Sequence, residues 1–177
     1  MKMAKKLLAV VLAGVLAVSL LTGCGGAVST KAIAEAMSDK TIADAMSDKS
    51  KEDGVVYRAD PELDEKAGQI AKMIKRKEEG DDPGTEPNIY GKIMGIMGED
   101  YAGKYVWIAA TTTKGGNVTT QAENLLEDVD KDSNINSAVP KGKNPAAVRS
   151  IGTVPITENG VDYRFAVITA DAVQDKV

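Results

Sequence analysis

Few residue types in this chain can do chemistry. The sequence contains no histidine and a single cysteine, Cys24. The lack of histidine excludes an imidazole general base, a serine-histidine-aspartate triad and histidine-based zinc or copper sites. An enzyme would have to use carboxylate, lysine, tyrosine or serine chemistry, and none of these groups is spaced in a catalytic pattern. We therefore predict a protein that is not an enzyme, with no catalytic, cofactor-binding or metal-binding residues.

Glu99 and Asp100 are the carboxylates that come nearest to a catalytic pair. They directly precede a segment with the pattern of a buried strand. Paired acids hydrolyse glycosidic bonds when they lie about 5 to 9.5 Å apart across a cleft. Adjacent acidic residues on a loop are more often solvated surface, so a hydrolase of the cell envelope is kept as an alternative only.

Asp128, Asp130 and Asp132 have the spacing that begins a calcium-binding loop. Such a loop needs glycine at its sixth position and glutamate at its twelfth. Here these positions hold Ser133 and Val139. The pattern therefore favours an acidic helix end that runs into a polar loop.

The first 21 residues have the features of an export signal. An uncharged apolar run over residues 7–21 follows a basic start, as in the two leading regions of a signal peptide. The run is too short to cross a bilayer core, which needs about 20 apolar residues. The basic residues are Lys2, Lys5 and Lys6.

The export segment ends at Leu21-Thr22-Gly23-Cys24, which resembles the lipobox of bacterial lipoproteins. In that family the cysteine becomes the N-terminus and carries acyl chains such as palmitate. Buried acyl chains contribute about 0.8 kcal/mol per CH2, and more than one chain gives stable anchoring. The resemblance implies a protein held in membrane lipid through Cys24, on the extracytoplasmic side of the cell membrane. The alternatives are a cysteine near an ordinary cleavage site and a free thiol.

Removal of the signal changes the charge balance. The chain has 22 basic and 26 acidic residues, and loss of the three signal lysines leaves 19 against 26, a net charge near −7. Nucleic acid is a poor partner for such a surface. We expect a signal peptide over residues 1–23, a tether over 24–30, a duplicated helical segment over 31–50, a globular domain over 55–170 and a tail over 171–177.

The duplicated segment repeats one motif, over residues 33–40 and again over 42–49. Nine residues at 100° each place equivalent side chains on opposite sides of a straight helix. Either the segment breaks near Ser38 and Asp39, or half of its apolar side chains stay exposed. We favour one or two helices that pack loosely on the domain. The methionines of the repeat, Met37 and Met46, would otherwise form a partner-binding face.

Three segments have the periodicity of amphipathic helices. The first begins with Asp60 as N-cap and Pro61 as first residue, and it stops at Gly80. Its apolar stripe consists of Leu63, Ala67, Ile70 and Ile74. The other two span residues 88–97 and 119–129. The first helix also ends in basic residues that match its dipole or, as an alternative, attract an anionic membrane surface. These residues are Lys72, Lys75, Arg76 and Lys77.

Strands are predicted in the second half of the chain. Residues 105–113 are apolar on both faces, which is typical of a strand with helices above and below it. Residues 133–145 lack periodicity and predict a mobile loop. The elements together predict an α+β fold, an α-β-α sandwich whose small, mainly antiparallel sheet is covered by helices. Its strands are expected near residues 104–113, 150–157 and 161–169.

Asn159-Gly160 predicts a two-residue turn between the last two strands. This turn fixes the register, because residues at equal distances from it must lie opposite each other. Proline cannot donate to a ladder, so we expect the strand that contains Pro155 to be an edge strand or to bulge there. The predicted pairs are Glu158 with Val161, Ile156 with Tyr163, and Val154 with Phe165.

Three segments resemble the CAP superfamily, which comprises the cysteine-rich secretory, antigen 5 and pathogenesis-related proteins. The segment Tyr57–Ala67 is similar to that family's first helix. Residues 122–129 resemble its last helix, and residues 151–154 and 163–167 resemble its terminal hairpin. The similarity spans roughly residues 32 to 170, and it implies an α-β-α sandwich.

The resemblance stops at the site residues. CAP proteins typically have a cleft with two histidines and two acidic residues, and this chain has no histidine. The family's histidine-containing segment after the first helix and its Gly-Glu-Asn segment have no counterparts here. The leading hypothesis is therefore a lipid-anchored extracytoplasmic protein whose domain binds an unknown protein or small molecule without catalysis. The alternatives are a carboxylate hydrolase and the solute-binding component of a transporter.

Overall fold

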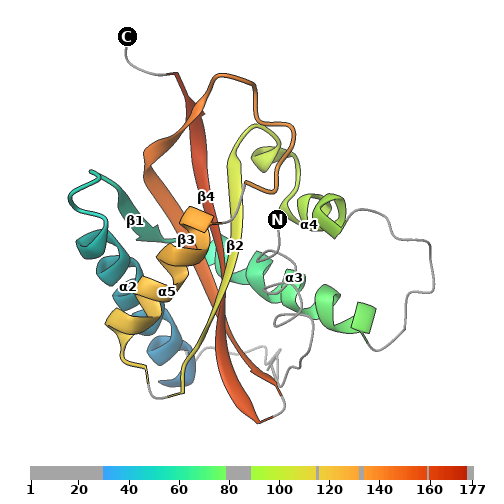
Figure 1. Cartoon of the computed structure of the whole chain (residues 1–177). Helices are drawn as coiled ribbons and strands as arrows, with labels where there is room; N and C mark the ends of the chain where they lie inside the picture. The colour runs from blue at the N-terminus through green and yellow to red at the C-terminus, as the bar shows by residue number, and fades with distance from the viewer. Residues whose placement is uncertain (1–29, 79–88, 115, 132–133, 159, 175–177) are drawn as a thin grey trace.

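The computed structural model describes residues 30–78, 89–114, 116–131, 134–158 and 160–174. In chain order the elements are α2 (Thr30–Lys49), β1 (Val56–Ala59), α3 (Pro61–Glu78), α4 (Ile89–Met97), a short 3-10 helix (Glu99–Tyr101), β2 (Tyr105–Thr112), α5 (Val118–Lys131), β3 (Asn144–Glu158) and β4 (Val161–Val173) (Figure 1).

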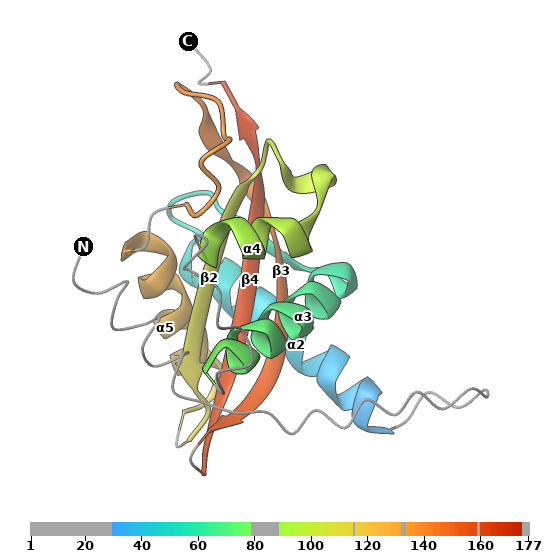
Figure 2. The same ribbon diagram turned by 90° about the vertical axis from the view of Figure 1, so that its right-hand side faces the viewer.

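The described strands form one four-stranded sheet in the order β1-β3-β4-β2. β3 pairs antiparallel with β4, and β4 with β2, while β1 lies parallel to β3. Helices α3 and α4 cover one face, and α2 and α5 cover the other (Figure 2). The predicted α+β sandwich with a mainly antiparallel sheet is confirmed. β1 is a fourth strand that the sequence patterns did not predict.

Each face of the sheet carries its own apolar core, because β2 and β4 are buried on both sides. On the α3/α4 side the core includes Leu63, Ile70, Ile93, Met97, Val106, Ile108, Phe165 and Val167. On the α2/α5 side it includes Ile42, Met46, Tyr57, Trp107, Leu125, Val129, Ile151 and Ile168. The predicted burial of residues 105–113 on both faces is confirmed for the middle of β2, whereas Thr112 at its end is exposed.

The β3–β4 hairpin has the predicted register, with Glu158 opposite Val161 and Val154 opposite Phe165. β1 pairs only with residues 148–151 of β3, so Pro155 lies in the part of β3 beyond β1, at the sheet edge. The missing N–H of Pro155 thus breaks no ladder bond. The irregularity of the strand falls between Pro145 and Arg149, and not at Pro155.

Helix α3 begins as predicted. The backbone N–H of Glu62 donates to Asp60 Oδ1 at 3.0 Å, and the predicted apolar stripe is buried. The start of the helix crosses β3 at Gly152, where a Cβ would overlap the backbone of Leu63 and Asp64. Only glycine allows this contact, and the contact brings Asp64 beside the sheet.

Helix α2 is continuous from Thr30 to Lys49, so of the two alternatives, a break near Ser38 and Asp39 or an unbroken helix, the structure has the unbroken helix. The second copy of the repeat supplies Ile42 and Met46 to the core, where both are fully buried. The side chains of residues 30–37 lie outside the description. The second copy of the repeat therefore packs firmly on the sheet, and not loosely as expected.

The loop expected to be mobile is tied to the edge of β2. Asn136 is buried, and its Nδ2 lies 2.8 to 3.0 Å from the carbonyl oxygens of Tyr101, Ala102 and Lys104. The N–H of Val106 donates to Asn134 Oδ1 at 2.8 Å. These bonds fix the described part of the loop, residues 134–143, against the sheet. The bond from Val106 also occupies a ladder position on β2, which is an edge strand.

Candidate functional site

The predicted lipid-attachment residue, Cys24, lies outside the described residues, as do the signal and most of the tether. In the part of the chain that is described, no helix combines the length and the hydropathy that a membrane crossing requires. Anchoring through Cys24 therefore stays a prediction from the sequence.

The acidic candidates do not assemble into a site. Glu99 and Asp100 are both exposed in the 3-10 helix that precedes β2, which takes away the geometric support for a carboxylate pair. Asp128 Oδ2 accepts the N–H of Ala110 at 3.4 Å, and Asp130 is exposed. Asp132 lies outside the description. Within residues 30–174, gaps apart, no cluster of acidic or cysteine side chains has the arrangement to hold a metal ion.

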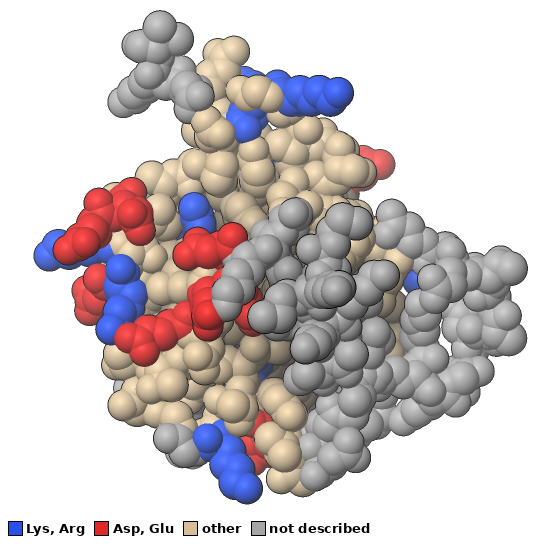
Figure 3. Space-filling model, viewed as in Figure 1, with Lys and Arg blue, Asp and Glu red and all other residues tan. Residues whose placement is uncertain are grey.

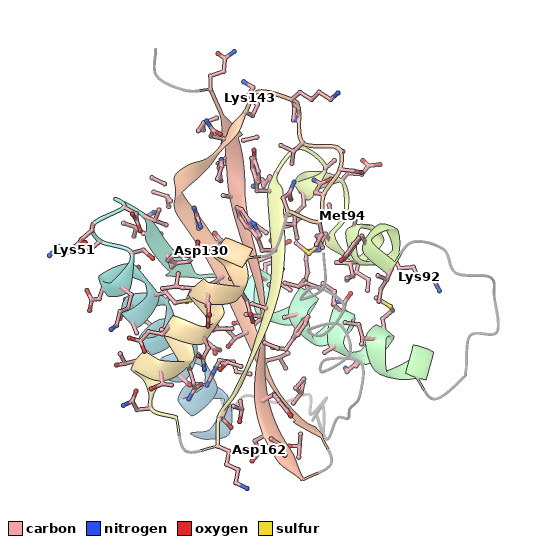
Figure 4. The ribbon with its side chains drawn as sticks, viewed as in Figure 1. Lys51, Lys92, Met94, Asp130, Lys143 and Asp162 are labelled. Atoms are coloured by element: carbon pink, nitrogen blue, oxygen red, sulfur yellow. The ribbon has the colours of Figure 1, made fainter. Side chains whose placement is uncertain are left out.

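Two arginines on the α2/α5 face of the sheet are the centres of its polar contacts. Figure 4 labels the two ends of this face: Asp162 lies next to the β3–β4 turn, and Lys143 lies at the opposite end. We call these the hairpin end and the Lys143 end. Arg164 belongs to the hairpin end and Arg149 to the Lys143 end. Acidic and basic side chains are otherwise interspersed over this side of the molecule (Figure 3).

Arg164 is enclosed by partners from three elements. Its Nη1 lies 2.8 Å from Asp39 Oδ1 of α2 and 2.8 Å from the hydroxyl of Thr153 on β3. The side chains of Arg164 and Asp39 are only 13% and 10% exposed. Thr153 Oγ1 also donates to Asp39. The remaining contacts are Nε with Gln121 Oε1 at 3.1 Å and Nη2 with Ser38 Oγ at 2.7 Å.

This network is built to hold the fold. The carboxylate of Asp39 is already engaged by the guanidinium of Arg164 and the hydroxyl of Thr153, so it is poorly placed to act as a base toward Thr153. Thr153 itself is buried. The network instead fastens α2 and α5 to β3 and β4 through charge-assisted hydrogen bonds.

Asp64 lies next to the network, at the start of α3. Its Oδ1 accepts the N–H of Thr153 at 2.7 Å, on the part of β3 beyond β1. The pKa of Asp64 is raised from 3.8 to about 6, chiefly by burial; the bond from Thr153 opposes the rise, and the nearby charge of Asp39 adds to it. This carboxylate thus changes charge near pH 6. It lies at the sheet edge, where it accepts the N–H of Thr153.

Arg149 is held by aromatic rings. The register places Tyr57, Arg149, Ala170 and Tyr105 in one row across the four strands. The guanidinium carbon lies 5.7 Å from the centre of the Tyr57 ring and 5.2 Å from that of Trp107. Tyr105 stacks on Trp107 with centroids 5.4 Å apart.

The hydrogen bonding of Arg149 is incomplete. Nη1 donates to the hydroxyl of Tyr57 at 3.0 Å, whereas the buried Nε has no partner among the described residues. Burial raises the pKa of the Tyr57 hydroxyl, Arg149 opposes the rise, and Asp130 adds to it. The backbone of Tyr57 is fixed from outside, since its N–H donates to Ser47 Oγ at 2.8 Å. A rigid, partly buried guanidinium results.

Neither arginine cluster was predicted from the sequence, although the hairpin register gave one indication of the cluster around Arg164. The hairpin register places Phe165 on one face, so Arg164 must lie on the other. A sheet covered on both faces then requires buried partners for Arg164. The partner Asp39 is remote in sequence, and nothing local identifies it. The aromatic partners of Arg149 come from β1, which was not predicted, and from β2.

Comparison of the chain with family models, with curated proteins and with solved structures finds no match. The resemblance to the CAP superfamily and to the lipobox of lipoproteins thus stays a prediction. The geometry of the described residues and the pattern of the sequence are the basis for the function proposed below.

Proposed function

We propose that this chain is a lipid-anchored extracytoplasmic lipoprotein whose folded domain binds a ligand or partner without catalysis. The observation that supports the anchor is Leu21-Thr22-Gly23-Cys24, which follows a basic and apolar export segment. Two acyl chains or more on Cys24 would give stable attachment to the membrane.

The non-catalytic role is supported by how the polar groups are used. The sequence has no histidine. The carboxylate that is best placed for chemistry, Asp39, is paired with Arg164 and with the hydroxyl of Thr153. The exposed pair Glu99 and Asp100 lies on the surface. Asp39 therefore holds α2 to the sheet, and Glu99 and Asp100 are in contact with solvent.

The position of the anchor gives the domain an orientation. Helix α2 starts at Thr30, and its first half contacts Arg164 at the hairpin end through Ser38. Its second half contacts Tyr57 through Ser47, toward the Lys143 end. Because Cys24 precedes α2 in the chain, we infer that the hairpin end lies nearer to the membrane than the Lys143 end.

Replacement of the cysteine tests the anchor. Cys24→Ser should move the protein from the membrane pellet to the soluble fraction and abolish labelling by a palmitate analogue, with an unchanged far-UV spectrum. The matched control is the double variant Cys24→Ser with Ser29→Cys, which restores a thiol outside the lipobox and should stay soluble and unlabelled. A Cys24→Ser protein that still pellets with membranes would refute the proposal.

A substrate screen tests the absence of catalysis. We expect the purified domain to leave peptide, ester and glycan substrates intact. Hydrolysis that is lost on replacing one acidic residue would show that the domain is an enzyme.

A further inference from the structure

The guanidinium of Arg149 is a cation without a carboxylate partner among the described residues. Its one hydrogen bond goes to the hydroxyl of Tyr57, and its other contacts are the ring faces of Tyr57 and Trp107. The buried Nε makes no hydrogen bond to any described residue. Nε and Nη2 together form one edge of the guanidinium. This edge donates both hydrogen bonds in a side-on, bidentate contact with a carboxylate.

An unpaired cation in this position is unusual. Removal of a charge from water is costly unless the charge is paired, and ring faces compensate only in part. A buried donor without a partner also requires an explanation, such as a water or an ion that is bound in solution. The rings hold the guanidinium plane fixed, so a ligand that pairs with it needs to restrict few further torsions.

We propose that Arg149 binds the carboxylate group of a ligand at the Lys143 end of the sheet. One planar guanidinium matches the single charge and the planar shape of a carboxylate better than the higher charge of phosphate. Buried aromatic groups surround it, and they strengthen the pair by lowering the local dielectric. Pairing through Nε, which is buried, requires a movement of the neighbouring side chains.

This site rests on the proposed function and gives it a ligand class. An anchor at the hairpin end would present Arg149 to molecules outside the cell. The carboxylate could come from a small organic acid or from the C-terminus of a peptide. Asp130, which is exposed on α5, is the acidic residue whose charge raises the pKa of Tyr57 in this cluster. Its negative charge opposes a second carboxylate, which makes its removal a useful control.

Trp107 supplies the readout, since it is the only tryptophan of the chain and lies against Arg149. The full chain in detergent micelles is titrated with acetate at constant ionic strength, with chloride as the balancing anion. We expect a saturable shift of the tryptophan emission, with a dissociation constant in the millimolar range. N-acetyl-glycyl-glycine should produce the same shift if a peptide C-terminus fits, and its C-terminal amide should not.

Three variants test the assignment. Arg149→Lys keeps the charge but loses the planar fork, and it should weaken acetate binding at least tenfold. Tyr57→Phe keeps the ring and removes the hydroxyl that positions Nη1, and it should weaken binding about threefold. Asp130→Asn removes the opposing charge and should bind acetate at least as tightly as the wild type. Near-UV circular dichroism checks the fold of each variant. If Arg149→Lys does not fold, the acetate affinity of Tyr57→Phe is the test of the site.

The outcomes separate this proposal from the one on which it rests. Release of the Cys24→Ser chain from membranes tests the anchor and leaves the titration unaffected. A shift that never saturates, or one that chloride or Arg149→Lys reproduces, would overturn the carboxylate site. Tighter binding of inorganic phosphate than of acetate would overturn the choice of carboxylate.

Discussion

Arg164 and Arg149 lie on the same face of one sheet, toward opposite ends of α2, and they have opposite surroundings. Arg164 has a carboxylate, two hydroxyls and an amide oxygen within hydrogen-bonding distance. Arg149 has two aromatic rings and one hydroxyl. A fully paired arginine stabilises the fold and has nothing left to offer a ligand, whereas a partly paired one retains that capacity. The difference indicates a structural role for the first and a binding role for the second.

The largest effect is expected at the partner of Arg164. Asp39→Ala leaves a buried guanidinium without its carboxylate and should lower the free energy of unfolding by about 3 kcal/mol. The duplication supplies the control, because Asp48 is the equivalent residue of the second copy and is exposed. Asp48→Ala should change stability by less than about 0.5 kcal/mol. Equal losses in urea unfolding would show that the Asp39 pair has no special role.

The two arginines can be compared directly by the same substitution. Arg164→Met strands Asp39 in a buried position and should cost about 3 kcal/mol. Arg149→Met strands no carboxylate of the described residues and removes a donor that lacks a partner, so it should cost about 1 kcal/mol or less. Midpoints and slopes of urea unfolding give both values. Similar costs for the two variants would contradict the contrast.

A smaller effect is expected at Asp64. Its pKa is about 6 in the folded protein, and we take the ordinary value of 3.8 for the unfolded chain. A raised folded pKa means that the contribution of this group to stability is complete below pH 3.8 and is lost as the pH rises through 6. Asp64→Asn removes that loss and retains an oxygen that can accept the N–H of Thr153. At pH 7.5 the variant should be more stable than the wild type.

The size of this gain is limited by solvent. A shift of about two pKa units corresponds to about 3 kcal/mol, and the partial exposure of Asp64 reduces the expected gain to about 1 kcal/mol. Urea unfolding of both proteins at pH 4 and pH 7.5 isolates the effect, because the other carboxylates are common to both. A gain of the same size at the two pH values would assign it to a cause other than titration.

Local patterns predicted the elements that local physics determines. The stripe of α3 and its cap at Asp60 follow from helix periodicity and dipole, and Asn159-Gly160 sets the register of the last two strands. β1 was missed because four residues have too short a pattern, and their pairing with residues 148–151 depends on the tertiary fold. The sequence left open whether α2 is one helix or two, and it predicted loose packing, whereas Ile42 and Met46 are fully buried in the core.

The arginine clusters could not be predicted from the sequence. Arg164 and Asp39 are separated by most of the chain, and the contact exists only once α2 lies on the sheet. Arg149 and its rings belong to three strands, and one of these, β1, was itself unpredicted. The sequence did indicate that a strand covered on both faces carries an arginine beside Phe165. It could not indicate which arginine is paired.

The contrast between the two arginines is tested most directly by measuring unfolding with and without a carboxylate. Urea unfolding of the wild type and of Arg149→Met is compared in acetate and in chloride at equal ionic strength. Acetate at tenfold above its dissociation constant should stabilise the wild type by about 1.4 kcal/mol and leave Arg149→Met unchanged. If acetate stabilises both proteins equally, or neither, Arg149 is not the site that binds carboxylates.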